Sequence, residues 1–400
     1  MSSLLHMFAV ILIVMPFALA GYAYVLYPAA LFLVVRYRRS GRQAQPSRHP
    51  EQWPAISITL SVYNEAVSVA GTLEALLAVD YPEDRRQILV VSDASTDKTD
   101  AIVEGFAARG VELFRVQSRR GKTAAEDAAV DLLRGEIIIN TDATTRVLPA
   151  SVKRLVRALG DQSVGVASGR DISVAGKGAE ASVGEAGYVG YEMWVRNLET
   201  RIGSIVGASG CFYAIRRHLH RTSLPAFLSR DFAAVLNARE QGYRSVSVDD
   251  AVCLVPRART LGSEVERKAR TMSRGIRTLW YRRALLDPRR YGAFSVMLAS
   301  HKLCRWLVGL TLPGALLGLA VLALTFRPAV YALAVSVIWI GVGSIAASRS
   351  GGSAQPRWLA ILGYAHGSLY AGVRAWLSVI RGERSSTWEP TRRDAEGLTR

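Results

Sequence analysis

The sequence contains little cysteine, little lysine and fewer acidic than basic residues. Its three cysteines, Cys211, Cys253 and Cys304, are odd in number, widely spaced and form no CxxC pattern. This argues against a zinc site and indicates reduced thiols in a cytosolic compartment. Only six of the 50 basic residues are lysines, and 33 acidic residues leave a formal net charge of +17.

The chain also lacks a basic patch interleaved with aromatic residues, so its charge does not predict a nucleic-acid partner. It has no internal repeat and no low-complexity tract. Half of its residues are hydrophobic, and the arginines cluster beside the apolar segments. This combination indicates a membrane protein with a basic cytoplasmic face. Four hundred residues allow a core domain with appendages.

Three segments of spanning length carry no charged residue. Residues 4–35 exceed the roughly 20 residues that cross a bilayer, and the following "RYRRSGR" places their C-terminal end inside the cell and the N-terminus outside. Residues 307–326 and 329–348 are separated only by Arg327 and Pro328. They predict a transmembrane hairpin whose turn faces the outside.

Two further segments predict helices at the membrane surface. In "SEVERKARTMSRGIRTLWYRR" apolar residues recur at steps of 4, 3, 4 and 3 from Val265 to Leu279, with arginines on the other faces. This basic amphipathic helix would lie on the membrane, pack on the domain, or do both. The apolar run 359–373 is short, and Arg374, Arg381 and Arg384 follow it. We expect an interfacial helix there, with a fourth span as the alternative.

These patterns divide the chain into five parts. They are an N-terminal transmembrane helix (1–35), a cytosolic domain (36–257), amphipathic interfacial helices (258–302), a transmembrane hairpin (303–349), and an interfacial helix with a basic cytosolic tail (350–400).

The cytosolic domain opens with alternating strand-like and helix-like patterns. Apolar residues alternate along residues 55–62, and strand patterns recur at 87–93, 111–116 and 136–143. Helical patterns separate them, at 67–77, 101–108 and 121–133. This rhythm predicts an α/β fold with a mostly parallel, doubly wound sheet.

Polar residues stand where three of these strands end, at Tyr63-Asn64-Glu65, at Asp93 and at Asp142. Ligands of such sheets bind beyond the carboxyl ends of the strands, so the joint placement predicts a binding site. Each residue alone would also fit a loop or a helix cap. In "NTDATTR", Thr144 stands where a second acid would complete an Asp-x-Asp metal clamp.

Seven motifs occur in the order and spacing of family 2 glycosyltransferases: "SVYNEA", "VSDASTDKT", "RRGKTAAEDAA", "NTDATTR", "GASGCFYAIRR", "SRDFAAVLNAREQGYRSV" and "RKARTMSRG". The chain therefore resembles membrane-integrated GT-A enzymes of that family, such as hyaluronan, chitin-oligosaccharide, poly-N-acetylglucosamine and cellulose synthases. Each motif alone is weak, but seven in order are specific. The resemblance covers about residues 50–395.

The resemblance implies a donor site for a nucleotide diphosphate sugar, with UDP expected because the resembling synthases mostly use UDP-sugars. Tyr63, Glu65 and Asp93 would hold the base and the ribose, and Lys122 would approach the nucleotide or its phosphates. The departing diphosphate needs cations, and the attacking hydroxyl needs a base.

The resemblance also implies a divalent metal, Mg²⁺ or Mn²⁺, that bridges the diphosphate. Asp142 would carry it, Ala143 would lie in the same donor site, and Thr144 would bind the metal through its hydroxyl or through water. Because Mg²⁺ takes only one or two protein carboxylates, Asp142 with the diphosphate would suffice. We therefore expect weak metal binding without nucleotide and tight binding with it.

Asp231 in "SRDF" matches the general base of the family, and an acid in the first turn of a helix is the less favoured alternative. Arg230 stands where the family usually has an acid, and a cation beside Asp231 would lower the pKa of the base. The glycine-rich turn "GASG" matches the region near the acceptor and contributes Gly207, Ser209 and Gly210.

The sequence departs from the processive members in "RTMSRG". Those members carry Gln-x-x-Arg-Trp, in which Arg grips the diphosphate and Trp stacks on the acceptor sugar. Here Thr271 replaces Gln, Arg274 is kept and Gly275 replaces Trp. Arg270 and Arg274 are four residues apart, so they share a helix face and would jointly face the pyrophosphate. Another aromatic residue would have to supply the platform, such as Trp280 or Trp194.

The resemblance thus implies an inverting glycosyltransferase of the inner (plasma) membrane, multi-pass, with a cytoplasmic catalytic domain and the bilayer as a partner. The expected acceptor is a growing polysaccharide. Transfer of a single sugar to a membrane lipid is the alternative, and an inactive nucleotide-binding scaffold is a more remote one. The sequence does not determine the sugar, the acceptor or the oligomeric state.

Overall fold

The structure is a computed structural model that describes residues 2–37, 52–174, 183–256, 261–349, 357–384 and 387. The chain forms two compact units. One comprises Met1–Val34, Gly178–Gly187 and Ala258–Glu383, and the other comprises Val35–Lys177, Tyr188–Arg257 and Arg384–Arg400. The arginines after residue 37 and the basic tail beyond residue 387, both used above to predict topology, lie outside the described residues.

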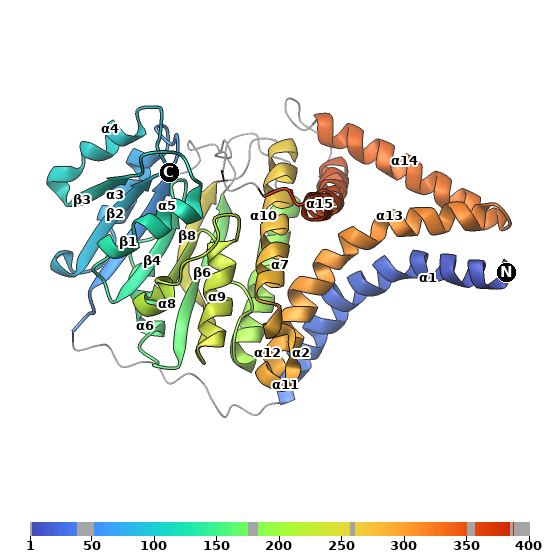
Figure 1. Ribbon diagram of the computed structural model, residues 1–400, viewed down its shortest axis with the longest axis horizontal. Coiled ribbons are helices and arrows are strands. Elements are labelled where there is room, and N and C mark those ends of the chain that lie inside the picture. Colours follow the sequence, from blue (N-terminus) through green and yellow to red (C-terminus); the bar gives the residue numbers. More distant parts are fainter. Residues whose placement is uncertain are drawn as a thin grey trace. The chain divides into compact units, whose positions relative to one another are not determined.

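The described part of the second unit is built on one mixed sheet in the order β3-β2-β1-β4-β7-β6-β8-β5 (Figure 1). Its strands are β1 (Ile56–Val62), β2 (Arg86–Ser92), β3 (Val111–Arg115), β4 (Ile137–Asp142), β5 (Arg146–Val147), β6 (Val164–Val174), β7 (Phe212–Arg216) and β8 (Arg244–Pro256). Its helices are α3 (Val69–Leu77), α4 (Thr99–Glu104), α5 (Lys122–Ala128), α6 (Ser151–Ala158), α7 (Val183–Ile202, whose first residues group with the other unit), α8 (Arg217–His220) and α9 (Arg230–Glu240).

The predicted α/β fold is confirmed, with a difference in the second half of the sheet. β1 to β4 are parallel, as the strand–helix rhythm predicts. β7 then runs antiparallel to both β4 and β6, and β8 runs parallel to β6. The sheet is therefore mixed. The helices expected over 101–108 and 121–133 are shorter than predicted, because each ends in a 3₁₀ turn, at Ala107–Arg109 and Val130–Leu132.

Strand β1 is buried along its whole length because it is central in the sheet. Its apolar residues join the core that α3 covers, where Leu73 and Leu76 are fully buried. Its polar residues face the other side and are paired: Ser57 donates to Gln87 (2.6 Å), Thr59 to Asn140 (3.1 Å) and Ser61 to Glu126 (2.7 Å). Both faces of the strand are thus satisfied, as burial of polar groups requires.

The first unit is helical. Its elements are α1 (Ser2–Gly21), a π-helical turn (Tyr22–Leu26), α2 (Tyr27–Tyr37), α10 (Leu261–Tyr281), a 3₁₀ turn (Arg283–Leu286), α11 (Pro288–Tyr291), α12 (Ala293–Leu298), a second π-helical turn (Ala299–Leu303), α13 (Cys304–Ala323), α14 (Arg327–Arg349) and α15 (Arg357–Ile380). α1 packs along α13, and α13 also contacts α14 and α15 (Figure 1).

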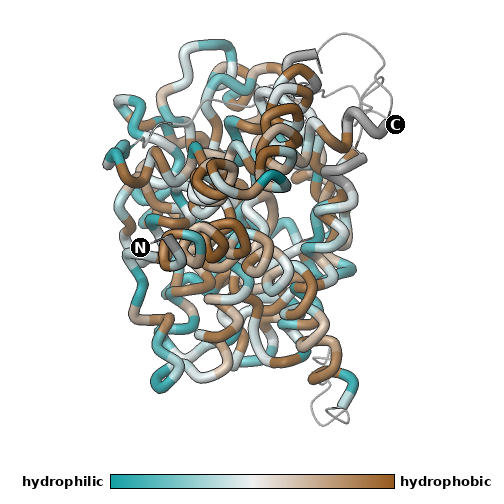
Figure 2. The backbone as a smooth tube through the Cα atoms, turned by 90° about the vertical axis from the view of Figure 1, so that its right-hand side faces the viewer, coloured by the Kyte–Doolittle hydropathy of each residue, from teal (hydrophilic) through white to brown (hydrophobic). Residues whose placement is uncertain are grey.

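Three helical segments of the described chain are long and apolar enough to cross a membrane: Ser3–Tyr37, Ala293–Ala323 and Arg327–Ile345. Figure 2 shows hydrophobic residues along the helix that starts at the N-terminus. The second segment begins earlier than the predicted residue 307 and includes Arg305. That guanidinium is 7% exposed and lies 4.8 Å from the Tyr24 ring centroid, which shields the charge. α15 is not among these segments.

The apolar stripe of α10 is covered by protein. Val265 and Ala269 form a cluster with Ala371 of α15, and Tyr364 packs against it. Lys268 donates to Ser368 of the same helix (2.7 Å). The stripe therefore packs on α15 of the same unit. Contact of α10 with the membrane surface or with the cytosolic domain stays a prediction.

Candidate active site

The carboxyl ends of β2, β1 and β4 bring the predicted donor residues to one edge of the sheet. The register pairs Val62 with Ser92 and Ser61 with Asp142. Tyr63 therefore follows β1 beside Asp93, which follows β2, while Asp142 is the last residue of β4 on the other side. Three residues that are distant in the sequence thus share one site.

Asp93 holds the loop that leads to Lys122. Its carboxylate is 5% exposed and accepts hydrogen bonds from the backbone N–H groups of Arg120 and Gly121, each at 2.8 Å. Gly121 has a φ of +92°, a conformation that favours glycine. In this structure Asp93 therefore positions the loop. The remaining lone pair on each carboxylate oxygen would be the acceptor for a hydrogen bond from a nucleotide.

Arg119 of the same loop lies over Tyr63. Its guanidinium carbon is 3.8 Å from the ring centroid, the geometry of a cation–π contact. Sequence reasoning missed Arg119, although the "RRGK" motif contained it. The arginine thus covers one face of the Tyr63 ring.

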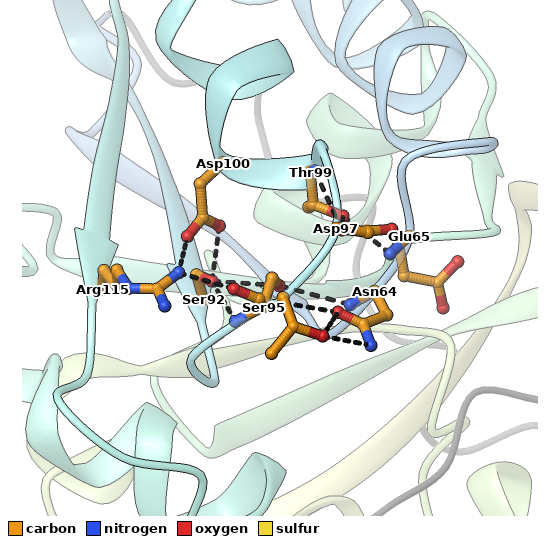
Figure 3. A network of polar contacts seen from close by, with 9 residues as sticks. Asn64, Glu65, Ser92, Ser95, Asp97, Thr99, Asp100 and Arg115 are labelled. Carbon is orange, nitrogen blue, oxygen red and sulfur yellow. Dashed lines mark hydrogen bonds and ion pairs between the residues drawn. The ribbon is translucent and has the colours of Figure 1, made fainter.

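Glu65 lies in a network that ties the loop after β1 to the loop after β2 (Figure 3). Its backbone N–H donates to Thr99 (2.8 Å), and its carboxylate accepts from Ser68 (2.6 Å). Asn64, with a φ of +52°, accepts from the backbone N–H of Thr96 (2.7 Å). The Glu65 side chain is 8% exposed, so it supports the loop from within.

Lys122 joins the donor loop to the predicted metal ligand. Its ammonium lies 2.5 Å from an Asp142 carboxylate oxygen and 3.9 Å from Glu126. Burial disfavours the charged form of Lys122, but three carboxylates outweigh burial and raise its pKa overall; they belong to Asp142, Glu126 and Asp231. The same ammonium thus senses both the predicted metal ligand and the predicted base.

The residues around Asp142 fit a divalent cation only in part. Asp142 and Thr144 offer hard oxygen donors of the kind that Mg²⁺ and Mn²⁺ prefer. Within the described residues no three His, Cys, Asp or Glu side chains group as a metal site. Ala143 is buried, and its carbonyl accepts from Thr72 (2.6 Å). A cation at Asp142 would need the donor diphosphate as a further ligand.

Asp231 stands in the first turn of α9, close to the glycine-rich turn. Ser229 donates to one of its carboxylate oxygens, and a Cβ added to Gly210 would lie 3.0 Å from the other. The Arg230 side chain does not accompany it. Its guanidinium is 6% exposed and pairs with Glu126 (3.1 Å) and with Asp127. The guanidinium expected beside Asp231 is therefore paired with the two carboxylates of α5 instead.

The glycine-rich turn rests on Asp171 of β6, a residue that sequence reasoning missed. Ser209 is 2% exposed, and its hydroxyl donates to both Asp171 oxygens (2.6 and 2.8 Å). Burial raises the pKa of Asp171, and the Ser209 hydrogen bond and the charge of Arg196 oppose this. Ser209 thus ties the turn to Asp171. Gly207, Ala208 and Ser209 are buried, whereas Gly210, beside Asp231, is partly exposed.

Arg270 and Arg274, predicted to face the pyrophosphate, lie on α10 of the first unit. They are one helical turn apart, and both are partly buried. Trp280 on the same helix is 71% exposed, with Arg283 over its ring (5.5 Å). Trp194 lies on α7, is 42% exposed and packs beside Tyr191. Their roles toward donor and acceptor stay predictions.

Residues 57–223 match the family model described as Glycosyl transferase family 2. The chain carries a family 2 glycosyltransferase domain. The match includes Asp93, Lys122, Asp142 and the glycine-rich turn, whereas Asp231 and α10 lie beyond it.

Two curated relatives of this glycosyltransferase domain differ in the acceptors that their names imply. Beta-monoglucosyldiacylglycerol synthase of Nostoc sp. is 26% identical over 168 residues, which cover 41% of this chain and 36% of the relative. Poly-beta-1,6-N-acetyl-D-glucosamine synthase of Staphylococcus epidermidis is 30% identical over 96 residues, which cover 24% and 23%. The chain thus matches about a third or less of the length of these relatives.

The fold has a counterpart among solved structures. A mannosyltransferase from Pyrobaculum calidifontis, solved in complex with GDP-Man and Mn²⁺, superposes with a TM-score of 0.70 and 22% identity. The comparison covers 95% of this chain and 99% of that one. The likeness extends to both the GT-A sheet and the helical part of the glycosyltransferase.

Helix α10, which lies beyond the matched glycosyltransferase domain, carries Gly275 for a packing reason. A Cβ added there would lie 2.8 and 3.0 Å from two ring carbons of Trp306 on α13. The indole of Trp306 therefore fills the space beside the position where processive members carry tryptophan. The Trp306 backbone carbonyl accepts from Trp376 on α15 (2.7 Å), which helps to hold the residue in place.

We expect Gly275→Ala to destabilise the helical unit. Alanine favours a helix by about 1 kcal/mol over glycine, but overpacking against a rigid ring costs about 1–3 kcal/mol. Gly262→Ala on the same helix is the matched control, because nothing lies within 4 Å of its added Cβ. Thermal unfolding in detergent should show a midpoint below that of wild type for Gly275→Ala. The midpoint of Gly262→Ala should not fall below that of wild type. Equal midpoints for the two variants would contradict the packing account.

Proposed function

We propose that the protein transfers a sugar from a nucleotide diphosphate sugar, a UDP-sugar, to an acceptor hydroxyl with inversion at the anomeric carbon. The observation that carries the proposal is the Lys122 ammonium, which lies 2.5 Å from Asp142 and interacts with the charge of Asp231. A cation for the leaving diphosphate, a carboxylate for a metal and a carboxylate for the attacking hydroxyl thus belong to one site.

The donor would bind across the ends of β2, β1 and β4. Tyr63 offers an aromatic face to the base, Asp93 and Glu65 border the ribose, and Lys122 reaches the diphosphate. A divalent metal held by Asp142, with Thr144 beside it, would neutralise charge on the diphosphate when bound. Arg270 and Arg274 of α10 are the further cations proposed for the pyrophosphate.

Asp231 would accept the proton of the acceptor hydroxyl as it attacks the anomeric carbon. The Ser229 hydrogen bond orients the carboxylate, and the missing side chain at Gly210 leaves room for its other oxygen. Arg230 links α9 to α5 through its ion pairs with Glu126 and Asp127. Because α5 begins with Lys122, these ion pairs support the position of Lys122 in the site.

The acceptor would be a growing polysaccharide at the cytosolic face of the inner membrane, with the N-terminus outside. The apolar segments and the name of the Staphylococcus relative support this choice. Transfer of one sugar to a membrane lipid is the second candidate. It is favoured by Gly275, which removes the stacking residue of processive members, and by the name of the Nostoc relative.

The test uses the purified full chain with Mn²⁺ or Mg²⁺ and UDP-, GDP- and dTDP-sugars. Released nucleotide identifies the donor, and the product mass identifies the reaction. A ladder of masses indicates a polymer, and a single added sugar on a lipid indicates the second candidate. Failure to release nucleotide from every donor, with and without membrane lipid extract, would refute the proposed transfer.

A further inference from the structure

The second unit contains a cavity at the edge of the sheet opposite to the donor site. It is open to solvent on one side and has a volume of about 550 Å³. It is lined by Ile137, the first residue of β4, and by Arg216, the last residue of β7, which pair in the sheet. Asp142 ends β4 five residues later, about 17 Å away at the rise of an extended strand. The cavity is therefore separate from the donor site.

The lining is strongly basic. Arg157, Arg216, Arg217, His218 and Arg221 line the cavity, and Glu136 is the only acidic residue of the lining. Burial and the charge of Arg216 lower the pKa of His218, as expected in a positive field. An excess of guanidinium groups in a concave site attracts anions.

Arg216 builds the floor of this cavity. Its guanidinium donates to the backbone carbonyls of Val164 (2.8 Å), Leu159 (2.8 Å) and Asp161 (3.1 Å). These bonds fix the guanidinium. The Asp161 carboxylate acts on it electrostatically but is hydrogen-bonded to Arg244 (2.5 Å), so no carboxylate among the described residues pairs directly with Arg216. The floor is thus rigid and positive before any ligand enters.

Arg217 and Arg221 make few contacts that would compete with a ligand. The Nε of Arg217 has no hydrogen-bond partner among the described residues, but it is buried and does not face the cavity. The ion pair of Arg221 within the described part of the chain is with Asp131, at 3.3 Å, and 93% of the Asp131 side chain is exposed. Such exposed pairs contribute little, so a bound anion would compete for Arg221 at small cost.

We propose that this cavity binds a phosphate ester. Guanidinium groups match the geometry of phosphate oxygens and bind them through paired hydrogen bonds. The volume exceeds that of a phosphate group, and the buried Val156 and Leu159 supply an apolar wall for an uncharged remainder. A soluble phosphate ester and the headgroup of a phospholipid share this chemistry.

The experiment measures binding of sn-glycerol 3-phosphate and of a short-chain phosphatidylglycerol to the full chain in a neutral detergent, at low ionic strength, by titration calorimetry. We expect at least one of the two probes to bind. The double variant Arg217→Gln/Arg221→Gln should weaken that binding about tenfold or more. The control Arg85→Gln/Arg134→Gln removes the same charge from arginines outside the cavity, which pair with Asp84 and Glu112, and should leave the affinity within about twofold.

The two probes distinguish the sources, since binding of phosphatidylglycerol alone assigns the cavity to a lipid and binding of glycerol 3-phosphate alone assigns it to a soluble ester. If the double variant does not fold, Arg221→Gln alone replaces it, because this side chain is 49% exposed. The proposal is overturned if neither probe binds, if the control variant loses as much affinity as the cavity variant, or if UDP displaces the probe.

Discussion

Asp231→Asn is expected to lower the rate of sugar transfer by about 10²–10⁴-fold, the contribution of a positioned general base. The amide cannot accept the proton of the attacking hydroxyl, while it keeps the size of the carboxylate and can still accept the hydrogen bond from Ser229. Nucleotide affinity should stay within about threefold of wild type, because the loss of one charge near Lys122 leaves the Asp142 ion pair in place.

Initial rates of nucleotide release with the preferred donor, together with titration of UDP in the presence of Mn²⁺, check this result. Asp80→Asn is the matched control, since Asp80 is an exposed carboxylate paired with Lys153 and lies outside the site. It should retain the wild-type rate. Wild-type transfer by Asp231→Asn would remove Asp231 from the role of base, even if the family assignment of residues 57–223 stands.

The first half of the sheet could be predicted because its signals are local. β1, β2 and β4 are apolar runs in parallel pairing, separated by helices, and their burial is nearly complete. β6 and β8 carry polar residues such as Asp249 and Asp250 within the strand and have register shifts, so no simple alternation marks them. Their place beside the antiparallel β7 depends on long-range pairing that a local pattern does not contain.

The candidate site likewise contains residues that the sequence could predict and residues that it could not. Asp93 and Asp142 could be proposed because each directly follows a strand. Arg230 was expected to act on Asp231 because the two are adjacent in sequence, but successive residues of a helix point about 100° apart. Its side chain therefore points to Glu126 in the interior. Asp171 lies within a strand, and its contact with Ser209 is formed only when β6 and the glycine-rich turn meet.

The packing around α10 was also beyond sequence reasoning. Gly275 was interpreted as the loss of an aromatic residue, whereas the structure places the indole of Trp306 against the same spot from another helix. A motif that is defined along one helix does not reveal a side chain supplied by a second one. The motif therefore lacks the stacking tryptophan, while an indole from α13 packs against the same part of α10.

The Lys122–Asp142 ion pair should control metal binding in the absence of donor. The Lys122 ammonium lies 2.5 Å from the carboxylate that would hold the cation, so a metal must displace it. We expect Lys122→Gln to strengthen Mn²⁺ binding to the nucleotide-free protein about tenfold, since a charge-assisted contact of this kind is worth about 1.5–3 kcal/mol. The same variant should weaken UDP binding, because the diphosphate loses a cation.

Asp142→Asn should act in the opposite sense on the metal. It removes the only carboxylate assigned to the cation, so Mn²⁺ should no longer improve UDP affinity, and transfer should fall by about 10³-fold or more with the loss of charge stabilisation on the leaving group.

Lys153→Gln is the matched control for Lys122→Gln, because Lys153 makes a surface ion pair of the same length, 2.5 Å, with Asp80. It should change neither metal nor nucleotide binding.

Electron paramagnetic resonance of free Mn²⁺, recorded with and without UDP, measures these affinities independently of catalysis. Wild type should bind Mn²⁺ weakly in the absence of UDP and tightly in its presence. Lys122→Gln should bind Mn²⁺ more tightly than wild type without UDP and gain less affinity when UDP is added. Tight Mn²⁺ binding by nucleotide-free wild type would contradict the competition between Lys122 and the metal. Unchanged Mn²⁺ affinity in Lys122→Gln would show that the Lys122–Asp142 ion pair does not compete with the metal. The donor dependence of metal binding would then come from the diphosphate alone, which supplies further ligands to the cation.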